Sequence, residues 1–187
     1  MNKPSLQLIC EMPKFKTGLE TYIAALGYKI CSNSEIIVLI DARMGTALRY
    51  LEKHGKPKPT VVITDNACSA YLQCLEGFKP EGMIFNSNGA DSIAEAVAII
   101  QNNQTYSNVP KPKVKFTPRE LTIARELARG LESKEIGLLV GKEPDATRKA
   151  VMEVLEKARA ASPSTIIANR TQFALWFWGQ DHVLDRQ

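Results

Sequence analysis

The stretch Phe116-Thr117-Pro118-Arg119-Glu120 opens the part of the chain that decides the fold. Thr117 is a favoured N-cap residue and Pro118 suits the first helical position. Glu120 stands three residues after the cap, where its carboxylate can accept a hydrogen bond from the amide of Thr117. Apolar residues then recur at helical spacing, and Gly130 supplies a left-handed stop. The sequence therefore predicts a helix that begins at Pro118 and ends near Gly130.

Two further helices are predicted, with a short turn between them. We expect the first to begin at Ser133 and to bury Ile136, Leu139 and Val140 before Gly141 turns the chain. Pro144 reopens a helix, whose expected inward residues are Thr147, Val151, Val154, Leu155 and Ala158. Two short helices joined by a tight glycine-containing turn are typical of a helix-turn-helix, whose second helix is expected to enter the major groove of DNA.

Several motifs of this stretch resemble one known family. They are Phe-Thr-Pro-Arg-Glu at 116–120, Gly130-Leu131-x-Ser133-Lys134-Glu135-Ile136, Val140-Gly141 and Asn169-Arg170-Thr171. Together they resemble the LuxR/NarL-type (FixJ-like) effector domain of bacterial response-regulator transcription factors, over roughly residues 116–179. Two features depart from the family: Ala146 stands where it usually has Thr or Ser, and 160–168 contains several residues beyond its short link.

The resemblance implies a set of DNA-contacting residues. Arg148, Lys149 and Met152 match the positions that the family presents to the major groove, where an Arg that binds guanine through two hydrogen bonds contributes about 1 to 3 kcal/mol of discrimination. Ser133, Lys134 and Lys142 are candidates for phosphate contacts, which position a protein without reading sequence. For each of these residues the alternative is an ordinary solvated surface position.

Composition restricts the class of protein. The 187 residues are 44% apolar and 24% charged, which is typical of a globular chain. No apolar run reaches the roughly 18 to 20 residues of a membrane span, and the first residues lack a signal-peptide profile, so we expect a cytoplasmic protein with no membrane partner. The four cysteines form no CxxC pair, and we expect buried reduced thiols and no zinc site.

The charge is unevenly divided along the chain. Residues 1–101 carry 10 basic and 10 acidic side chains, and residues 102–187 carry the remaining 14 and 10, so the whole net charge of +4 lies in the second half. This division suits a DNA-binding half joined to a neutral partner domain, although a solvated helical face would give the same count.

The first hundred residues alternate between apolar strands and helices. Strands are expected at Leu6–Cys10, Ile36–Ile40, Val61–Thr64 and, as the last strand, Met83–Phe85, with helices between and after them. This alternation predicts a parallel, doubly wound sheet whose functional crevice lies at the carboxyl ends of the strands.

Three segments stand at the predicted strand ends: Leu8-Ile9-Cys10-Glu11-Met12-Pro13-x-Phe15-x-x-Gly18-Leu19, Val38-Leu39-Ile40-Asp41-Ala42-Arg43-Met44 and Val61-Val62-Ile63-Thr64. They resemble receiver domains of response regulators, and the likeness covers roughly residues 5–105. In that family two acidic residues hold Mg²⁺, an Asp accepts the phosphoryl group, and a hydroxyl and a Lys contact its oxygens. The matching positions here are Cys10, Glu11, Asp41, Thr64 and Asn86. A thiol is a poor Mg²⁺ ligand and Asn carries no charge, so neutralisation of a phosphoryl group is weakened. We therefore expect a phosphorylation-independent pseudo-receiver, with Asp41 as a solvated or hydrogen-bonded acid at a strand end.

The spacing also predicts that one crossover helix is missing. Only Ser32–Glu35 separates a candidate strand at Tyr28–Cys31 from the next strand, whereas a parallel crossover usually needs a dozen residues or more. Tyr28–Cys31 is therefore either paired antiparallel with its neighbour or no strand at all. We expect the missing helix to leave an apolar patch near Ile36, Val38 and Ile40 as a dimer or partner surface.

The last predicted helix, Thr171–Trp178, is dense in large apolar residues. Its family counterpart packs against a second copy, which would suit a homodimer on two DNA half-sites. The alternative is that these residues pack against the receiver-like domain or the tail Gly179–Gln187.

The predicted architecture is an α/β doubly wound receiver-like domain, shortened by one crossover helix, in residues 1–101, a linker in 102–115 and a small all-α helix-turn-helix domain in 116–187. No nucleophile–base pair, metal spacing or phosphate-binding glycine loop is present, so we expect neither enzymatic activity nor a cofactor. The leading hypothesis is a transcription regulator that binds double-stranded DNA as a homodimer, with RNA polymerase or another regulator as a further partner. The alternative is an interaction module that sequesters or masks a regulatory partner, with weak or no DNA binding.

Overall fold

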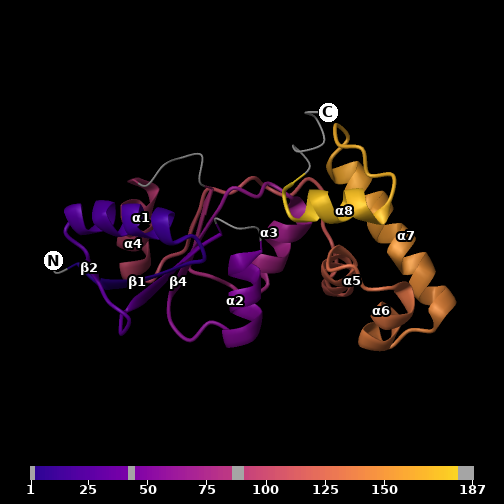
Figure 1. Ribbon diagram of the computed structural model, residues 1–187, viewed down its shortest axis with the longest axis horizontal. Coiled ribbons are helices and arrows are strands. Elements are labelled where there is room, and N and C mark those ends of the chain that lie inside the picture. The colour runs from indigo at the N-terminus through magenta and orange to yellow at the C-terminus, as the bar shows by residue number, and fades with distance from the viewer. Residues whose placement is uncertain (1–2, 42–44, 86–90, 181–187) are drawn as a thin grey trace. The chain divides into compact units, whose positions relative to one another are not determined.

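The computed structural model describes residues 3–41, 45–85 and 91–180 (Figure 1). By its contacts the chain divides into two compact units, which we call the sheet unit and the helical unit. The sheet unit comprises Met1–Asp65 and Leu75–Val109, and the helical unit comprises Asn66–Cys74 and Pro110–Gln187. The predicted order of an α/β part followed by an all-α part is confirmed, but the helical unit also includes a short segment from earlier in the sequence.

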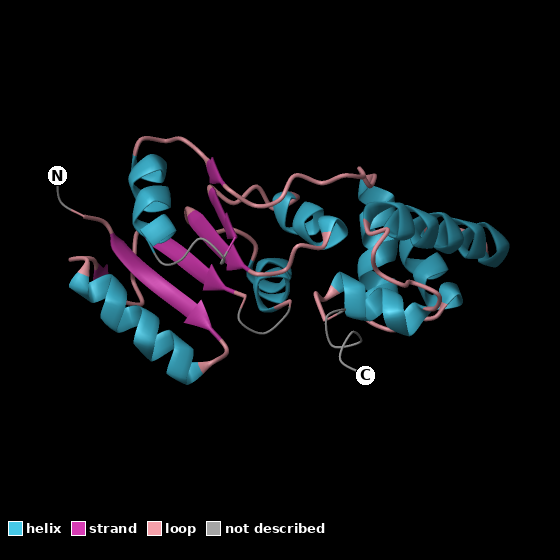
Figure 2. Cartoon of the chain, turned by 90° about the horizontal axis from the view of Figure 1, so that it is seen from above, coloured by secondary structure: helices cyan, strands magenta, loops and turns pink. Residues whose placement is uncertain are grey.

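The sheet unit is built on a parallel sheet (Figure 2). Among the described residues its strand order is β2-β1-β3-β4-β5-β6, and every neighbouring pair is parallel. The bounds are β1 Ser5–Cys10, β2 Lys29–Ile30, β3 Ile36–Ile40, β4 Thr60–Thr64, β5 Gly82–Phe85 and β6 Tyr106–Ser107. β3 and β4 are buried along their whole length, as expected for central strands that are covered on both faces.

Helices cover both faces of this sheet. α1 (Pro13–Ala25) and α4 (Asp91–Gln101) supply Ile23, Ile93, Val97 and their neighbours to a core that also contains alternate residues of β1, β3 and β4. The other residues of β3, Ile37 and Leu39, are buried on the opposite face, where α2 (Thr46–His54) packs. A helix α3 (Ser69–Glu76) connects β4 to β5.

The second strand differs from both alternatives predicted for it. β2 is a strand of two residues, and it pairs parallel with β1, with Lys29 opposite Ser5 and Ile30 opposite Leu6. Ile36 of β3 is also opposite Leu6, on the other side of β1. β2 thus ends at the level of the sheet where β3 begins. The chain does not have to run back along the sheet before it enters β3, and residues 31–35 make the connection without a helix.

The prediction that Ile36, Val38 and Ile40 lie near an uncovered apolar patch is also wrong. Ile36, Val38 and Ile40 are buried in the core beneath α1 and α4, on the face opposite the one that the absent helix would cover. The uncovered positions belong to β1, where Gln7 and Ile9 are only partly buried while Leu6 and Leu8 are buried. The alternation of side chains along a strand explains the difference, since neighbouring residues point to opposite faces.

The segment predicted to be a linker contains a further strand. β6, at Tyr106–Ser107, pairs with β5 through Gly82 and Met83, so β5 is not the last strand of the sheet. The side-chain oxygen of Asn108 accepts a hydrogen bond from the amide of Phe85 at 2.7 Å, which extends this pairing. A strand of two residues carries too little apolar pattern to be recognised in a polar stretch.

The helical unit contains α5 (Pro118–Ala128), α6 (Ser133–Val140), α7 (Pro144–Ala161) and α8 (Arg170–Phe177). The predicted capping box is confirmed: the amide of Glu120 donates to Thr117 Oγ1 at 3.3 Å, and the amide of Thr117 donates to Glu120 Oε2 at 2.7 Å. Gly130 has a φ of 89°, the left-handed value expected where α5 ends, and Gly141, which was expected to turn the chain after α6, has a φ of 63°.

The aromatic residues of α8 are covered within the helical unit. Phe173, Trp176 and Phe177 are buried, and the indole N–H groups of Trp176 and Trp178 donate to Ser162 Oγ at 2.7 Å and to the carbonyl of Ala128 at 2.9 Å. Tyr71 packs edge-on against Phe177 at a centroid distance of 5.7 Å. A second copy of the chain is therefore not required to bury these rings, and dimerisation stays a prediction that rests on other grounds.

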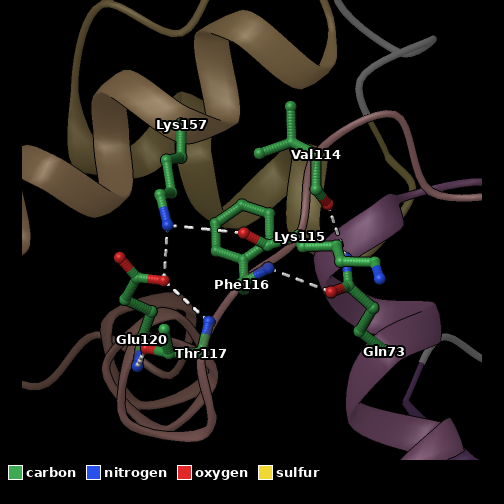
Figure 3. A network of polar contacts seen from close by, with 7 residues as sticks. All are labelled: Gln73, Val114, Lys115, Phe116, Thr117, Glu120 and Lys157. Carbon is green, nitrogen blue, oxygen red and sulfur yellow. Dashed lines mark hydrogen bonds and ion pairs between the residues drawn. The ribbon is translucent and has the colours of Figure 1, made fainter.

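Asn66–Cys74 is tied to the helical unit by hydrogen bonds as well. Figure 3 shows Gln73 held between two backbone groups: its Nε2 donates to the carbonyl of Val114 at 2.9 Å, and its Oε1 accepts from the amide of Phe116 at 3.0 Å. Asn66 Nδ2 donates to the carbonyl of Phe177 at 3.0 Å. These bonds fix the chain immediately before α5 and at the end of α8.

Candidate nucleic-acid interface

The helix-turn-helix is built from α6, the turn at residues 141–143, and α7. The turn is tight because the amide of Lys142 donates to the carbonyl of Gly137 at 3.0 Å and Gly141 adopts a left-handed conformation. Gly137 lies so close to α7 that an added Cβ would stand 2.8 Å from Thr147 Oγ1 and 2.9 Å from the carbonyl oxygen of Lys142. The absence of a side chain at Gly137 therefore determines how closely the two helices approach.

The inward face of α7 is as predicted. Thr147, Val151, Val154, Leu155 and Ala158 are all buried, and the hydroxyl of Thr147 donates to the carbonyl of Glu143 at 2.9 Å. The opposite face carries the three residues expected to contact bases: Arg148 and Lys149 are exposed, and Met152 is 51% exposed. These side chains lie on one to two turns of the same helix face, a spacing that suits contact with neighbouring base pairs.

An aspartate stands at the entrance to this face. Asp145 Oδ1 accepts from Arg148 Nη1 at 3.1 Å, and both side chains are largely exposed, so this ion pair contributes little to stability. A negative charge in the first turn interacts favourably with the helix dipole but repels phosphate. Asp145 thus lowers the positive potential of this face and occupies one hydrogen-bond donor of the Arg148 guanidinium.

The three predicted phosphate contacts differ in their surroundings. Lys134 is exposed and Lys142 is half-buried. The hydroxyl of Ser133 instead accepts from Arg170 Nη2 at 2.6 Å, while Arg170 Nη1 donates to Glu132 Oε2 at 3.1 Å. Arg170 was not among the predicted site residues. The Asn169-Arg170-Thr171 motif indicated a helix start but gave no sign of a contact 37 residues earlier in the chain.

One predicted core position of α6 is wrong. Leu139 is 60% exposed and its neighbour Leu138 is 79% exposed, whereas Ile136 is fully buried and Val140 partly so. The close approach at Gly137 brings α7 against the face of Ile136 and Gly137, which leaves both leucines outside the contact. Two exposed leucines beside each other on a helix-turn-helix are a feature that DNA contact does not explain.

Of the five residues predicted at receiver-like positions, the structure brings two together, Asp41 and Thr64. Asp41 is only 3% exposed; its Oδ2 accepts from the hydroxyl of Thr64 at 3.0 Å and its Oδ1 from the amide of Ala47 at 3.1 Å. The carboxylate thus binds groups of its own chain at both oxygens. This arrangement agrees with the expectation of a hydrogen-bonded acid at a strand end.

The other three receiver-like positions differ in their surroundings. Cys10 Sγ accepts from the amide of Met12, and Glu11 Oε2 pairs with Arg49 at 3.2 Å. Asn86 lies outside the described residues. In the part of the chain that the structure describes, no group of three or more His, Cys, Asp or Glu side chains is placed to hold a metal ion. The four cysteines are free thiols, with Cys68 and Cys74 buried and Cys10 and Cys31 half-buried.

Among the residues that the structure describes, no helix is both long enough and apolar enough to cross a membrane.

Comparison with known proteins gives structural relatives only. No protein family and no curated protein matches the sequence. A solved structure of two RcsB dimers bound to two parallel DNAs is similar over 94% of this chain and 98% of that one, with a TM-score of 0.58 and 12% identity. A structure of RcsB from Salmonella enterica serovar Typhimurium, bound to promoter P1flhDC with the phosphomimetic BeF3⁻, is similar over 95% of this chain and 98% of that one. Its TM-score is 0.58 and its sequence identity is 13%. Similarity at this identity shows a shared fold.

Proposed function

We propose that this protein is a sequence-specific DNA-binding transcription regulator that acts as a dimer and without phosphorylation. The observation that carries the proposal is the outward face of α7, where Arg148, Lys149 and Met152 are exposed on the helix that follows the turn. Arg148 is the principal base-reading residue, because its guanidinium can donate two hydrogen bonds to guanine. Two solved structures of similar fold are of RcsB bound to DNA, which supports the same use of this fold here.

Independence from phosphorylation is supported by Asp41. Its two carboxylate oxygens accept hydrogen bonds from Thr64 and Ala47, and the side chain is almost fully buried. Phosphoryl transfer would require the carboxylate to break these bonds and to gain a cation beside it, whereas Glu11 is paired with Arg49. Input to the sheet unit therefore takes another form.

The test is a selection of genomic fragments by the purified full-length protein, followed by a salt titration of binding to the best fragment. A dimeric regulator should enrich a palindromic site, and its affinity should fall steeply with salt. Arg148→Ala should weaken binding to that site about 5- to 150-fold, the equivalent of about 1 to 3 kcal/mol. Lys14→Ala, which removes an exposed positive charge from α1, is the matched control and should leave sequence preference unchanged.

A second candidate function is supported by the exposed leucines. Leu138 and Leu139 could bury apolar surface against a protein partner, and Asp145 weakens the case for phosphate contact. In this case the protein would sequester or mask a regulator. Absence of any enriched DNA at low salt, together with loss of a partner complex in Leu138→Ser/Leu139→Ser but not in Arg148→Ala, would favour this function over DNA binding.

A further inference from the structure

A small groove lies in the sheet unit beside the carboxyl end of β1. Ile9 and Glu11 line one side, and the residues of α2 from Thr46 to His54 that face them line the other. The groove has a volume of about 200 Å³. It belongs to neither the face of α7 nor the hydrogen bonds of Asp41, and Glu11 is its only residue among the five receiver-like positions.

The groove exists because of the short connection between β2 and β3. In a doubly wound sheet, a helix that connects two consecutive parallel strands such as β2 and β3 would cover the face of the sheet beside α2. Residues 31–35 make this connection without a helix, and Ile9 remains half-buried although it lies in a strand of the sheet. The floor of the groove is therefore apolar surface that the fold leaves uncovered.

The wall formed by α2 is positively charged. Arg49, Lys53 and His54 lie on the lining face, and the ring of His54 packs on that of Tyr50 at a centroid distance of 4.6 Å. Glu11 balances the charge of Arg49 through their ion pair at 3.2 Å. Lys53 forms no ion pair with any residue that the structure describes, so the groove carries a net positive charge above an apolar floor.

Basic residues in the last turn of a helix also interact favourably with the helix dipole, and Lys53 and His54 occupy that turn. The dipole explains the charges but neither the hollow nor the position of Ile9 and the Tyr50 ring within it. An apolar floor with a cationic rim is the combination that recognises an organic anion, since the ring or chain is desolvated while its charge is neutralised.

The size of the groove limits the ligand. Pockets for drug-sized molecules and nucleotides usually measure about 300 to 1,000 Å³, which is larger than this groove. We propose that the groove binds a small organic anion with an apolar body, of the class of single-ring carboxylates. Such a ligand would act on the sheet unit as an input signal that does not involve Asp41. The inference goes beyond DNA binding and does not depend on it, because the site and its test concern the sheet unit alone.

The experiment is an amide chemical-shift titration of the full-length protein, labelled with ¹⁵N. The probes are benzoate, benzamidine as a cation of the same ring, and inorganic phosphate as an anion without an apolar body. We expect saturable shifts with benzoate in residues 9–11 and 46–54, and no saturable shifts there with the other two. Lys53→Glu should weaken benzoate binding about fivefold or more, through loss of attraction and added repulsion, and Lys14→Glu, the same charge change on α1, should not.

Four results would overturn the proposal. Equal responses to benzoate and benzamidine would show that the ring alone partitions onto the surface. Equal responses to benzoate and phosphate would show that the ligand needs no apolar body. Unchanged affinity in Lys53→Glu would place the benzoate elsewhere. Saturable binding of a short helical peptide rich in Glu and Leu, with no response to benzoate, would make the groove a protein-docking site. The fold of each variant is checked from its own amide spectrum, which should otherwise match that of the wild type.

Discussion

Replacing Gly137 with alanine should destabilise the helical unit, although alanine is the better helix former. An alanine Cβ would lie 2.8 Å from Thr147 Oγ1 and 2.9 Å from the carbonyl oxygen of Lys142, and real Cβ contacts are essentially never shorter than 3.0 Å. Thr147 is fully buried with its hydroxyl bonded to Glu143, and the Lys142 carbonyl is backbone, so neither atom can move alone. The turn must shift as a whole.

The two opposing contributions decide the size of the effect. Overpacking a well-packed site costs about 1 to 3 kcal/mol, and two short contacts, one of them to backbone, favour the upper part of that range. Alanine regains about 1 kcal/mol of helix propensity relative to glycine. The expected net loss in the free energy of unfolding is therefore about 1 to 2 kcal/mol. Gly18→Ala in α1 is the control: its Cβ would meet nothing within 4 Å, so the same substitution should stabilise the sheet unit.

The assay uses the placement of the tryptophans. The chain has two, Trp176 and Trp178, and both lie in the helical unit, so urea unfolding followed by tryptophan emission reports that unit alone. With a urea m value of about 1 to 3 kcal/mol/M, Gly137→Ala should lower the midpoint by about 0.3 to 2 M. Gly18→Ala should leave the emission midpoint in place and raise the midpoint of the sheet-unit transition followed by far-ultraviolet circular dichroism. An emission midpoint that is unchanged or raised in Gly137→Ala would refute the reasoning.

Three further predictions concern charged groups. Burial raises the pKa of Glu120, but hydrogen bonds from Lys157 and Thr117 outweigh this effect and lower the pKa below its ordinary value. The stabilising effect of Glu120 is therefore present above about pH 4.3 and is lost as the pH falls through the lowered pKa. In Glu120→Gln, acid titration of tryptophan emission should show a smaller loss of stability below about pH 4.3, and a loss identical to that of the wild type would contradict the assignment. If the protein binds DNA, Asp145→Asn should strengthen binding several-fold by removing repulsion of phosphate, as measured by fluorescence anisotropy at two salt concentrations, whereas weaker binding would mean that the carboxylate itself accepts from a base. Acetyl phosphate with Mg²⁺ should leave the intact mass unchanged because Asp41 is buried and bonded at both oxygens, and a phosphorylated species that disappears in Asp41→Asn would refute this.

The sequence predicted those elements whose local signals agree with their surroundings. The strand at Ile36–Ile40 has the predicted bounds because five consecutive β-formers are buried on both faces. The start of α5 follows from Thr117, Pro118 and Glu120, whose capping interactions are local and do not depend on the rest of the fold. The inward face of α7 was likewise readable from its spacing.

The wrong predictions concern features that only distant contacts decide. Leu139 has the spacing of a core residue, but the absence of a side chain at Gly137 brings α7 against a different face of α6. β2 and β6 have two residues each and are strands only because a neighbouring strand pairs with them. The hydrogen bond between Arg170 and Ser133 joins residues 37 positions apart, and nothing near either residue signals it.

The helical unit includes Asn66–Cys74, and this affects the order in which it can fold during synthesis. Asn66 contacts Phe177 across 111 positions of the chain, and Gln73 contacts Phe116 across 43. A ribosome therefore produces Asn66, Tyr71 and Gln73 long before the helices that they contact. The contacts of Phe177 with Asn66 and Tyr71 form only when both ends of a long loop meet. A fragment that begins at Pro110, although it contains every residue of the helix-turn-helix, should fold less stably than the same residues in the whole chain. The helix-turn-helix of this protein therefore depends for its stability on residues that lie far outside it in the sequence.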